Sequence, residues 1–158
     1  MDSLPPHLPY RHLTTLTLSV DFAAVVPVGA TPAGHRGIAP VIGGRFEGER
    51  LRGTVLPGHD WFVTRADGVL VIDVRLTLNT DDGATIYLAY GGRMVGQGDA
   101  MARFRKGEKL AAEEYSLTIT AKFECGDPRY AWLNDAIIVG VGAQQPTGPV
   151  YTMFEVGA

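Results

Sequence analysis

The chain has 158 residues, of which 46% are hydrophobic and 20% charged, and its 14 basic and 17 acidic side chains give a formal net charge of −3. This composition is typical of a globular protein and predicts one domain over residues 1–158 that buries a sizeable core without disulfides or structural metals. The acidic balance argues against nucleic acid or an anionic membrane as a partner, because phosphate binding needs clustered positive charge.

Most of the chain divides into short segments in which apolar and polar residues alternate with a period of two, as in half-buried strands. The 20 glycines and 10 prolines fall between these segments and predict many turns. Residues 29–34 are predicted to form an exposed loop or bulge, because Pro27 ends the preceding ladder. In chain order, the predicted strands cover residues 13–22, 36–42, 45–56, 59–63, 70–78, 84–90, 114–124, 130–133, 136–141 and 150–156.

The clearest prediction is a hairpin between residues 70–78 and 84–90, where the alternation is strict on both sides of the turn. Residues 81–83 read Asp-Asp-Gly, and Asp-Gly suits a tight reversal because both residues tolerate positive φ angles. Residues 99–109 form the one predicted helix, with Asp99 as its N-cap. Because this helix is short, we expect it to serve as a lid or plug.

About ten strands with hairpin-length connections predict an all-β fold. Closure into one antiparallel barrel, or tight packing as a sandwich, avoids exposed strand edges. We favour a single closed antiparallel β-barrel of about ten strands with one short helix, because several strands have both faces too apolar or too specific to be left in water.

Cysteine usage and the start of the chain predict the compartment. The lone Cys125 has no partner for an internal disulfide, which favours a reducing environment. Apolar stretches are too short to span a bilayer, and residues 1–12 lack the basic start and apolar stretch of a signal peptide. We therefore expect a soluble, cytoplasmic protein with an extended N-terminal segment at residues 1–12.

Several short motifs occur in an order that resembles the bacterial and fungal proteins of domain-of-unknown-function family 3237. The segments that carry the resemblance are GGRFEG at 43–48, GTVLPGHDW at 53–61, DVR at 73–75, TDDGATIY at 80–87 and FECGDPRYAWLN at 123–134. The similarity runs from about Leu13 to the C-terminus and implies a compact β-barrel without a settled activity. His59 stands where we expect the family to carry a small residue, so a role for His59 would be particular to this protein.

The sequence lacks the signatures of common cofactor-dependent and nucleophilic chemistry. The GQG at 96–98 does not extend to a dinucleotide fingerprint, and no phosphate loop or nucleophile elbow is present. The four histidines have no metal-ligand spacing, and Cys125 has no partner cysteine. We therefore expect no cofactor and no metal site.

The first candidate for chemistry is the sequence His59-Asp60-Trp61 at a predicted strand start. An Asp beside a His in a partly closed site could orient the His as a general base near neutral pH. We predict Asp60, together with His59, as catalytic acid or base, and Trp61 as a substrate-binding residue. In the alternative interpretation, Asp60 caps the preceding Pro-Gly turn and Trp61 fills the core.

Asp73 and Arg75 lie two residues apart on the less apolar face of the predicted strand 70–78, so they point to the same side. If that side faces inward, the Arg75 guanidinium is suited to bind a carboxylate, phenolate or enolate oxygen. We predict Arg75 as a catalytic residue that stabilises an oxyanion, and Asp73 as substrate-binding. If the side faces outward, the two form a surface pair of little energetic value, and alternation leaves both interpretations open.

Aromatic and polar side chains supply further candidates for ligand binding. The predicted substrate-binding residues of this kind are Tyr87, Tyr115, Glu124, Trp132 and Asn134. Glu124 could act as a second acid, and Tyr130 and Tyr151 belong to the same group of amphipathic rings. Alternatively, the aromatic residues are ordinary core residues and Asn134 belongs to a turn or cap.

Two functions of different classes fit these residues. The first is a small-molecule-binding barrel that acts as a cofactor-free isomerase, cyclase or lyase, by proton transfer on an aromatic, ketone or enol-type substrate, with Asp60 and Arg75 on the wall of one cavity. The second is a non-catalytic ligand carrier or self-associating module, whose apolar outer face is covered by a symmetric partner. The expected partners are a small-molecule ligand and further copies of the chain, with a homodimer favoured.

Overall fold

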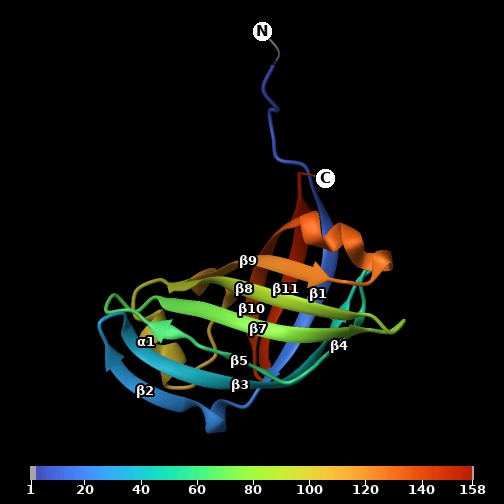
Figure 1. Cartoon of the computed structure of the whole chain (residues 1–158). Helices are drawn as coiled ribbons and strands as arrows, with labels where there is room; N and C mark the ends of the chain where they lie inside the picture. Colours follow the sequence, from blue (N-terminus) through green and yellow to red (C-terminus); the bar gives the residue numbers. More distant parts are fainter. Residues whose placement is uncertain (1–2, 158) are drawn as a thin grey trace.

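The computed structural model describes residues 3–157, in which strands dominate (Figure 1). Its strands are β1 (Tyr10–Val20), β2 (Val26–Thr31), β3 (Gly34–Glu47), β4 (Gly53–Val55), β5 (Gly58–Asp60), β6 (Val63–Thr64), β7 (Leu70–Thr80), β8 (Thr85–Gly96), β9 (Tyr115–Cys125), β10 (Ile137–Gln145) and β11 (Gly148–Val156). The helical segments are α1 (Ala100–Arg105) and the 3-10 segments η1 (Phe22–Ala24), η2 (Ala112–Glu114) and η3 (Pro128–Asp135). Residues 1 and 2 of the predicted N-terminal segment lie outside the described residues.

Eight antiparallel strands close into a barrel. They follow the order β1-β11-β10-β9-β8-β7-β4-β3, and the pairing of β1 with β3 joins the two ends of the sheet. The short strands β5 and β6 pair with the same neighbours as β4, namely β3 and β7, while β2 pairs with β3. The predicted closed all-β barrel with one short helix is therefore confirmed, with eleven strands within residues 3–157 in place of about ten.

The predicted hairpin is confirmed as β7 and β8, whose pairing runs from Leu70 opposite Met94 to Asn79 opposite Thr85. Alternate residues of β7, beginning with Ile72, are buried, whereas the residues between them are exposed or half-buried. The apolar face of β7 is therefore its inward face, which fixes the direction of every polar side chain on this strand.

Two predicted boundaries in the N-terminal half are wrong. The strand predicted at 36–42 continues to residue 47 as β3, because the glycine pair at 43–44 allows close contact instead of a turn. The strand predicted at 45–56 is instead divided between the end of β3 and β4. A Cβ atom on Gly44 would lie 2.2 Å from a backbone oxygen of β1, so glycine lets β3 approach β1. The loop predicted at 29–34 is partly β2, where Pro27 is tolerated because β2 pairs only with β3 among the described strands.

Residues 130–133, predicted as extended, belong instead to the 3-10 segment η3. The Asp127 carboxylate accepts a hydrogen bond from the backbone N–H of Arg129 at 2.9 Å and caps the start of the segment. Pro128 occupies its first turn, where a missing N–H is tolerated. These start signals outweigh the local alternation and explain the error.

The predicted helix at 99–109 is confirmed in its N-terminal part as α1. It ends at Arg105, and Gly107 then adopts a φ of 87°, a left-handed conformation that suits glycine after a helix. Asp99 makes no N-cap hydrogen bond, because its carboxylate binds Arg103 Nε at 3.0 Å. The ion pair between Asp99 and Arg103, four residues apart, therefore stabilises the first turn of the helix in place of a cap.

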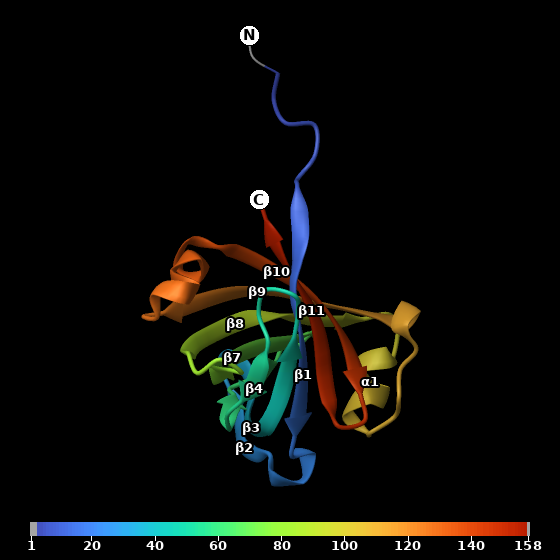
Figure 2. The ribbon, with the colours of Figure 1, turned by 90° about the vertical axis from the view of Figure 1, so that its right-hand side faces the viewer.

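The two ends of the barrel differ in what covers them (Figure 2). The chain termini and η3 lie at one end, and α1 lies at the other end, near the turn between β10 and β11. Toward the η3 end, large apolar side chains that are at most 1% exposed fill the interior; they include Leu13, Phe46, Leu51, Leu78, Phe123 and Leu133. Because these side chains fill only the half of the interior near η3, a cavity can form in the other half, toward α1.

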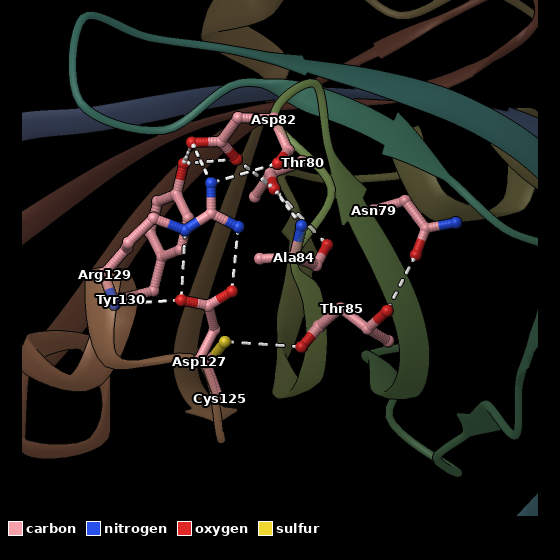
Figure 3. A network of polar contacts seen from close by, with 9 residues as sticks. All are labelled: Asn79, Thr80, Asp82, Ala84, Thr85, Cys125, Asp127, Arg129 and Tyr130. Carbon is pink, nitrogen blue, oxygen red and sulfur yellow. Dashed lines mark hydrogen bonds and ion pairs between the residues drawn. The ribbon is translucent and has the colours of Figure 1, made fainter.

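A polar network ties the β7–β8 turn to η3 at the packed end (Figure 3). The Asp82 carboxylate accepts hydrogen bonds from the Thr80 hydroxyl at 2.6 Å and the Tyr130 hydroxyl at 2.8 Å. The Arg129 guanidinium donates to the Asp82 carbonyl oxygen at 3.0 Å and to the Asp127 carboxylate at 2.8 Å. These residues come from the last two motifs that carry the resemblance, so these motifs support the fold at this end.

Replacing Asp82 by Ala is expected to lower the thermal unfolding midpoint, because Thr80 and Tyr130 both lose an acceptor. Asp81 offers a matched control, since its side chain is similarly exposed but its carboxylate pairs with Arg45 and makes no contact with η3 among the described ion pairs and hydrogen bonds. Calorimetry should therefore show a larger decrease for Asp82→Ala than for Asp81→Ala. Equal decreases would mean that the network does not hold η3 in place.

Candidate functional site

Strand pairing decides which side chains of residues 59–61 point into the barrel. In β5, Asp60 lies opposite Val74 of β7, and His59 lies opposite Arg75. Val74 is 2% exposed and faces the interior. Because directly paired residues share one face of a sheet, Asp60 points inward and His59 points outward.

A cavity of about 810 Å³ occupies the α1 end of the barrel interior, with Asp60 in its wall. Its lining is mainly apolar: the barrel strands contribute Leu18, Val20, Ala39, Val41, Leu70, Ile72 and Val74, and the surrounding segments contribute Phe22, Phe62, Met101, Phe104 and Leu110. A volume of this size lies in the range of pockets that bind small organic molecules. The cavity is therefore the candidate binding site.

The environment of Asp60 changes its acidity. Burial raises the pKa of Asp60 from 3.8 to about 7, and the nearby Asp73 carboxylate adds to the rise. One hydrogen bond acts in the opposite direction, since the Asp73 backbone N–H donates to Asp60 Oδ1 at 3.1 Å and favours the charged form. Asp60 therefore exchanges between protonated and ionised forms near neutral pH, as a general acid or base requires.

Two buried tyrosines share the cavity wall with Asp60. Tyr90 of β8 and Tyr151 of β11 are 4% and 1% exposed, and their ring centroids lie 5.3 Å apart in an edge arrangement. Burial, and then charge repulsion that includes Asp60, raises the pKa of both phenols well above the usual value. Both hydroxyls therefore stay protonated at neutral pH and can donate hydrogen bonds to a ligand oxygen.

α1 and the residues that follow it form one side of the cavity. Met101 and Phe104 of α1, with Leu110 after it, line the cavity, and Met101 and Leu110 are each 7% exposed. Among the strands of the barrel, this short helix packs mainly against β8. Whether the segment serves as the expected lid or plug stays a prediction.

Arg75 does not line the cavity, so the expectation that Asp60 and Arg75 lie on the wall of one cavity is wrong. Arg75 and Asp73 are exposed on the outer face of β7, because Ile72 and Val74 occupy its inner face. The apolar face of this strand is thus the core face, and the outward alternative holds for both charged residues. An oxyanion formed in the cavity must be stabilised by groups other than the Arg75 guanidinium.

His59 and Trp61 also lie outside the cavity. Their rings are neighbours on the outer surface, with centroids 5.7 Å apart. Trp61 is half-buried there and continues the pairing with β7, since its backbone N–H donates to the Asp73 carbonyl oxygen at 2.9 Å. The expectation that His59 and Asp60 act together is therefore not supported by their directions, and Trp61 does not fill the core.

Three other predicted residues meet in an open groove on the outer face. Tyr87 and Glu124 lie opposite each other on β8 and β9, and Asn134 of η3 borders the same groove. The Asn134 side chain accepts from the Cys125 backbone N–H and donates to the Cys125 carbonyl oxygen, both at 2.9 Å. Asn134 thus links η3 to β9, which agrees with the alternative that it belongs to a turn or cap.

The last two predicted ligand-binding rings do not line the cavity and make other contacts. The Tyr115 hydroxyl accepts a hydrogen bond from the Gln144 backbone N–H at 2.8 Å. Trp132 of η3 lies under the Arg50 guanidinium, 4.8 Å from its ring centroid. Of the predicted site residues, Asp60 alone lines the cavity.

The two cavity tyrosines were not among the predicted site residues. For Tyr90 a sequence signal existed, because alternation places it on the same face as Ile86 and Leu88, and a buried phenol needs a polar partner. Tyr151 was recognised only as an amphipathic ring. No local pattern brings it to Asp60, since β11 and β5 come together through closure of the barrel.

Within residues 3–157, no three or more His, Cys, Asp or Glu side chains are grouped so that they could hold a metal ion. In the same part of the chain, no helix has both the length and the apolar character needed to cross a membrane.

The sequence matches proteins that have no assigned function. Residues 11–156 match the family described as "Protein of unknown function (DUF3237)". One curated relative is the UPF0311 protein RPA1785 of Rhodopseudomonas palustris, which is 28% identical over 97% of this chain and 99% of the relative. Another is the UPF0311 protein CA_C3321 of Clostridium acetobutylicum, which is 26% identical over 93% of each chain.

Solved structures share the fold over nearly the whole chain. The β-barrel-like protein ABAYE2633 from Acinetobacter baumannii is 32% identical, with a TM-score of 0.85 over 98% of this chain and 99% of that one. RPA1785 is 28% identical, with a TM-score of 0.90 over 96% and 99%. A protein from Penicillium herquei, described as an enzyme, is similar in fold alone, with 18% identity and a TM-score of 0.73 over 99% of both chains.

Proposed function

This chain belongs to the DUF3237 family, and we propose that its barrel binds a small organic molecule and catalyses a proton transfer on it without a cofactor. The observation that carries the proposal is the cavity wall itself, where the Asp60 carboxyl group lies among apolar side chains beside the phenols of Tyr90 and Tyr151. A base and protonated donors facing one apolar space are the groups that enolisation requires.

The lining of the cavity supports an apolar, unsaturated substrate. Leu18, Val41, Ile72 and Val74 present apolar surface, and rings such as Phe104 can pack against a flat molecule. Few polar groups are available to replace water around a strongly hydrated substrate. Aromatic ketones, phenols and enols therefore fit the cavity better than sugars or nucleotides.

Each group has one step in the proposed reaction. The ionised Asp60 carboxylate removes a proton from a carbon next to the substrate carbonyl, and the electron pair moves onto the carbonyl oxygen. The hydroxyls of Tyr90 and Tyr151 donate hydrogen bonds to the resulting enolate oxygen, in the role first assigned to Arg75. Protonated Asp60 then returns the proton to another atom of the substrate, which completes an isomerisation. In an elimination, the enolate electron pair instead moves back and expels a leaving group with its bonding pair, and Asp60 gives its proton to that group.

A non-catalytic carrier is the second candidate, because the same apolar lining would hold a ligand without changing it. The two candidates differ in whether Asp60 takes part in a reaction. A carrier needs no group that titrates near neutral pH in its wall, whereas the pKa of Asp60 is raised to about 7. This difference favours the enzyme.

Binding and turnover can be separated with two simple probes. Phenylnaphthylamine, a neutral dye that fluoresces in apolar surroundings, reports occupancy of the cavity. Nitrobenzisoxazole reports proton removal, since a base takes its ring C–H proton while the N–O bond breaks to give a coloured cyanonitrophenolate. We expect the protein to bind the dye and to accelerate the elimination above the buffer rate.

Ala39→Phe tests whether both signals come from the cavity. Ala39 lies opposite Asp60 in the strand pairing and lines the cavity, so a phenyl ring there would fill part of the space. We expect this variant to remain folded and to lose at least about tenfold in dye affinity and elimination rate. Dye binding by the wild type without any elimination would favour the carrier, and absence of dye binding would overturn both candidates.

A further inference from the structure

The cavity lining changes character from its floor to its opening. Deep residues such as Val74 and Tyr151 are 2% and 1% exposed. By contrast, the lining residues at the end of α1 and after it, from Arg105 to Lys109, are exposed to solvent, as is Gln145 at the β10–β11 turn. The opening therefore lies between the α1 segment and this turn, where a ligand would reach water.

The charged side chains at this opening differ in whether they have an ion-pair partner. Arg105, Glu108 and Lys109 all border the cavity. Glu108 is only weakly paired, since Arg103 Nη1 lies 3.8 Å from its carboxylate and the same guanidinium already binds two closer carboxylates. Among residues 3–157, no acidic side chain forms an ion pair with Arg105 or Lys109, so two cations at the opening keep their charge available.

The turn between β6 and β7, which Arg105 approaches, adds no competing negative charge. Its guanidinium approaches the turn at Gly68, with Nη1 4.0 Å from the position that a Cβ there would occupy. The neighbouring Asp67 carboxylate is already bound by Arg65, with Nε at 3.0 Å. Arg105 is thus held at the opening beside a neutralised turn.

From this arrangement we infer that the ligand carries an anionic group, which binds at the opening to Arg105 and Lys109 while its apolar body enters the barrel. The inference rests on the proposed function and narrows its substrate class to amphipathic anions, such as aromatic or ketone-bearing molecules with a carboxylate, sulfonate or phosphate. Guanidinium and ammonium groups bind such oxyanions by charge-assisted hydrogen bonds. The anionic group also fixes which end of the molecule reaches Asp60.

A matched pair of dyes tests this inference. Anilinonaphthalene sulfonate and phenylnaphthylamine share one ring system and differ by the sulfonate group. The measured quantity is the ratio of their affinities, obtained by fluorescence titration, for the wild type and for the double variant Arg105→Gln/Lys109→Gln. We expect the sulfonate dye to lose about tenfold in affinity in the double variant while the neutral dye changes little.

The control removes two cations elsewhere. Arg93 and Lys122 are exposed on β8 and β9, do not line the cavity and give the same change in net charge when both become Gln. We expect this control to keep the wild-type ratio. An unchanged ratio in Arg105→Gln/Lys109→Gln, or an equal loss in the control, would overturn the anion site while leaving the cavity intact; failure of both dyes to bind the wild type would overturn the proposed function itself.

Discussion

Asp60→Asn is expected to slow the elimination of nitrobenzisoxazole by about a hundredfold to ten-thousandfold, the range that a positioned general base contributes. Asparagine has nearly the same shape and can still accept the Asp73 backbone N–H, so the cavity should keep its form. What it lacks is a basic oxygen. Phenylnaphthylamine affinity should therefore change little while the rate falls.

Glu124→Gln is the matched control for this loss. Glu124 was the other predicted acid, but it lies exposed in the groove on the outer face of β9. Its amide variant should keep the wild-type rate. If the two variants lose activity equally, or if Asp60→Asn keeps full activity, the base is not Asp60 and the proposed reaction loses its central residue.

The pH dependence supplies a second signature of Asp60. The base must be ionised, and its pKa lies near 7, so kcat/KM for the elimination should rise with pH and reach half of its plateau at about pH 7. The residual rate of Asp60→Asn should lack this step. A step near pH 4 in the wild type would mean that the carboxylate is not buried as described.

The sequence predicted the barrel because its strands alternate almost without interruption. Strict alternation at residues 70–78 and 84–90 depends on burial of one face, and burial of one face also determines the observed pairing of β7 with β8. Errors arose where local chemistry competes with alternation. At η3 the Asp127 cap and Pro128 favour a 3-10 turn over a strand.

The site was harder to predict because a period of two groups side chains without saying which group faces inward. Asp73 and Arg75 were correctly placed on one side, yet that side faces solvent. His59 and Asp60 are adjacent, so only one of them can point into the barrel. Tyr151 joins Asp60 only through closure of the sheet, which no local pattern contains.

Asp60→Asn should also make the protein more stable at neutral and alkaline pH. Burial raises the pKa of Asp60 from 3.8 to about 7, so between these values the folded protein holds a proton that the unfolded chain has released. The unfolded state then binds fewer protons than the folded state, and the free energy of unfolding falls as pH rises through this interval. Below about pH 4 both states are protonated and the contribution is fully present.

Over this interval of about three pH units, the free energy of unfolding falls by up to roughly 4 kcal/mol, at about 1.4 kcal/mol for each unit. The asparagine side chain of the variant carries no proton that can be lost in this range, so the variant lacks this decline. Urea unfolding of both proteins should give equal free energies near pH 4 and a growing advantage for the variant up to about pH 7, constant above it. Other titrating groups are common to both proteins and cancel in the difference.

The sign of this difference separates a functional carboxyl group from a structural one. A carboxylate retained because it stabilises the fold through ion pairs or hydrogen bonds has a lowered pKa, as Asp127 does beside Arg129, and its removal destabilises the protein above that pKa. Asp60 is half-buried in the cavity wall, with one opposing hydrogen bond and no described cation paired with it. A less stable Asp60→Asn variant at about pH 8 would therefore place Asp60 with the structural carboxylates, whereas a more stable and inactive variant would show that the fold tolerates an unfavourable charge at the position where the reaction needs it.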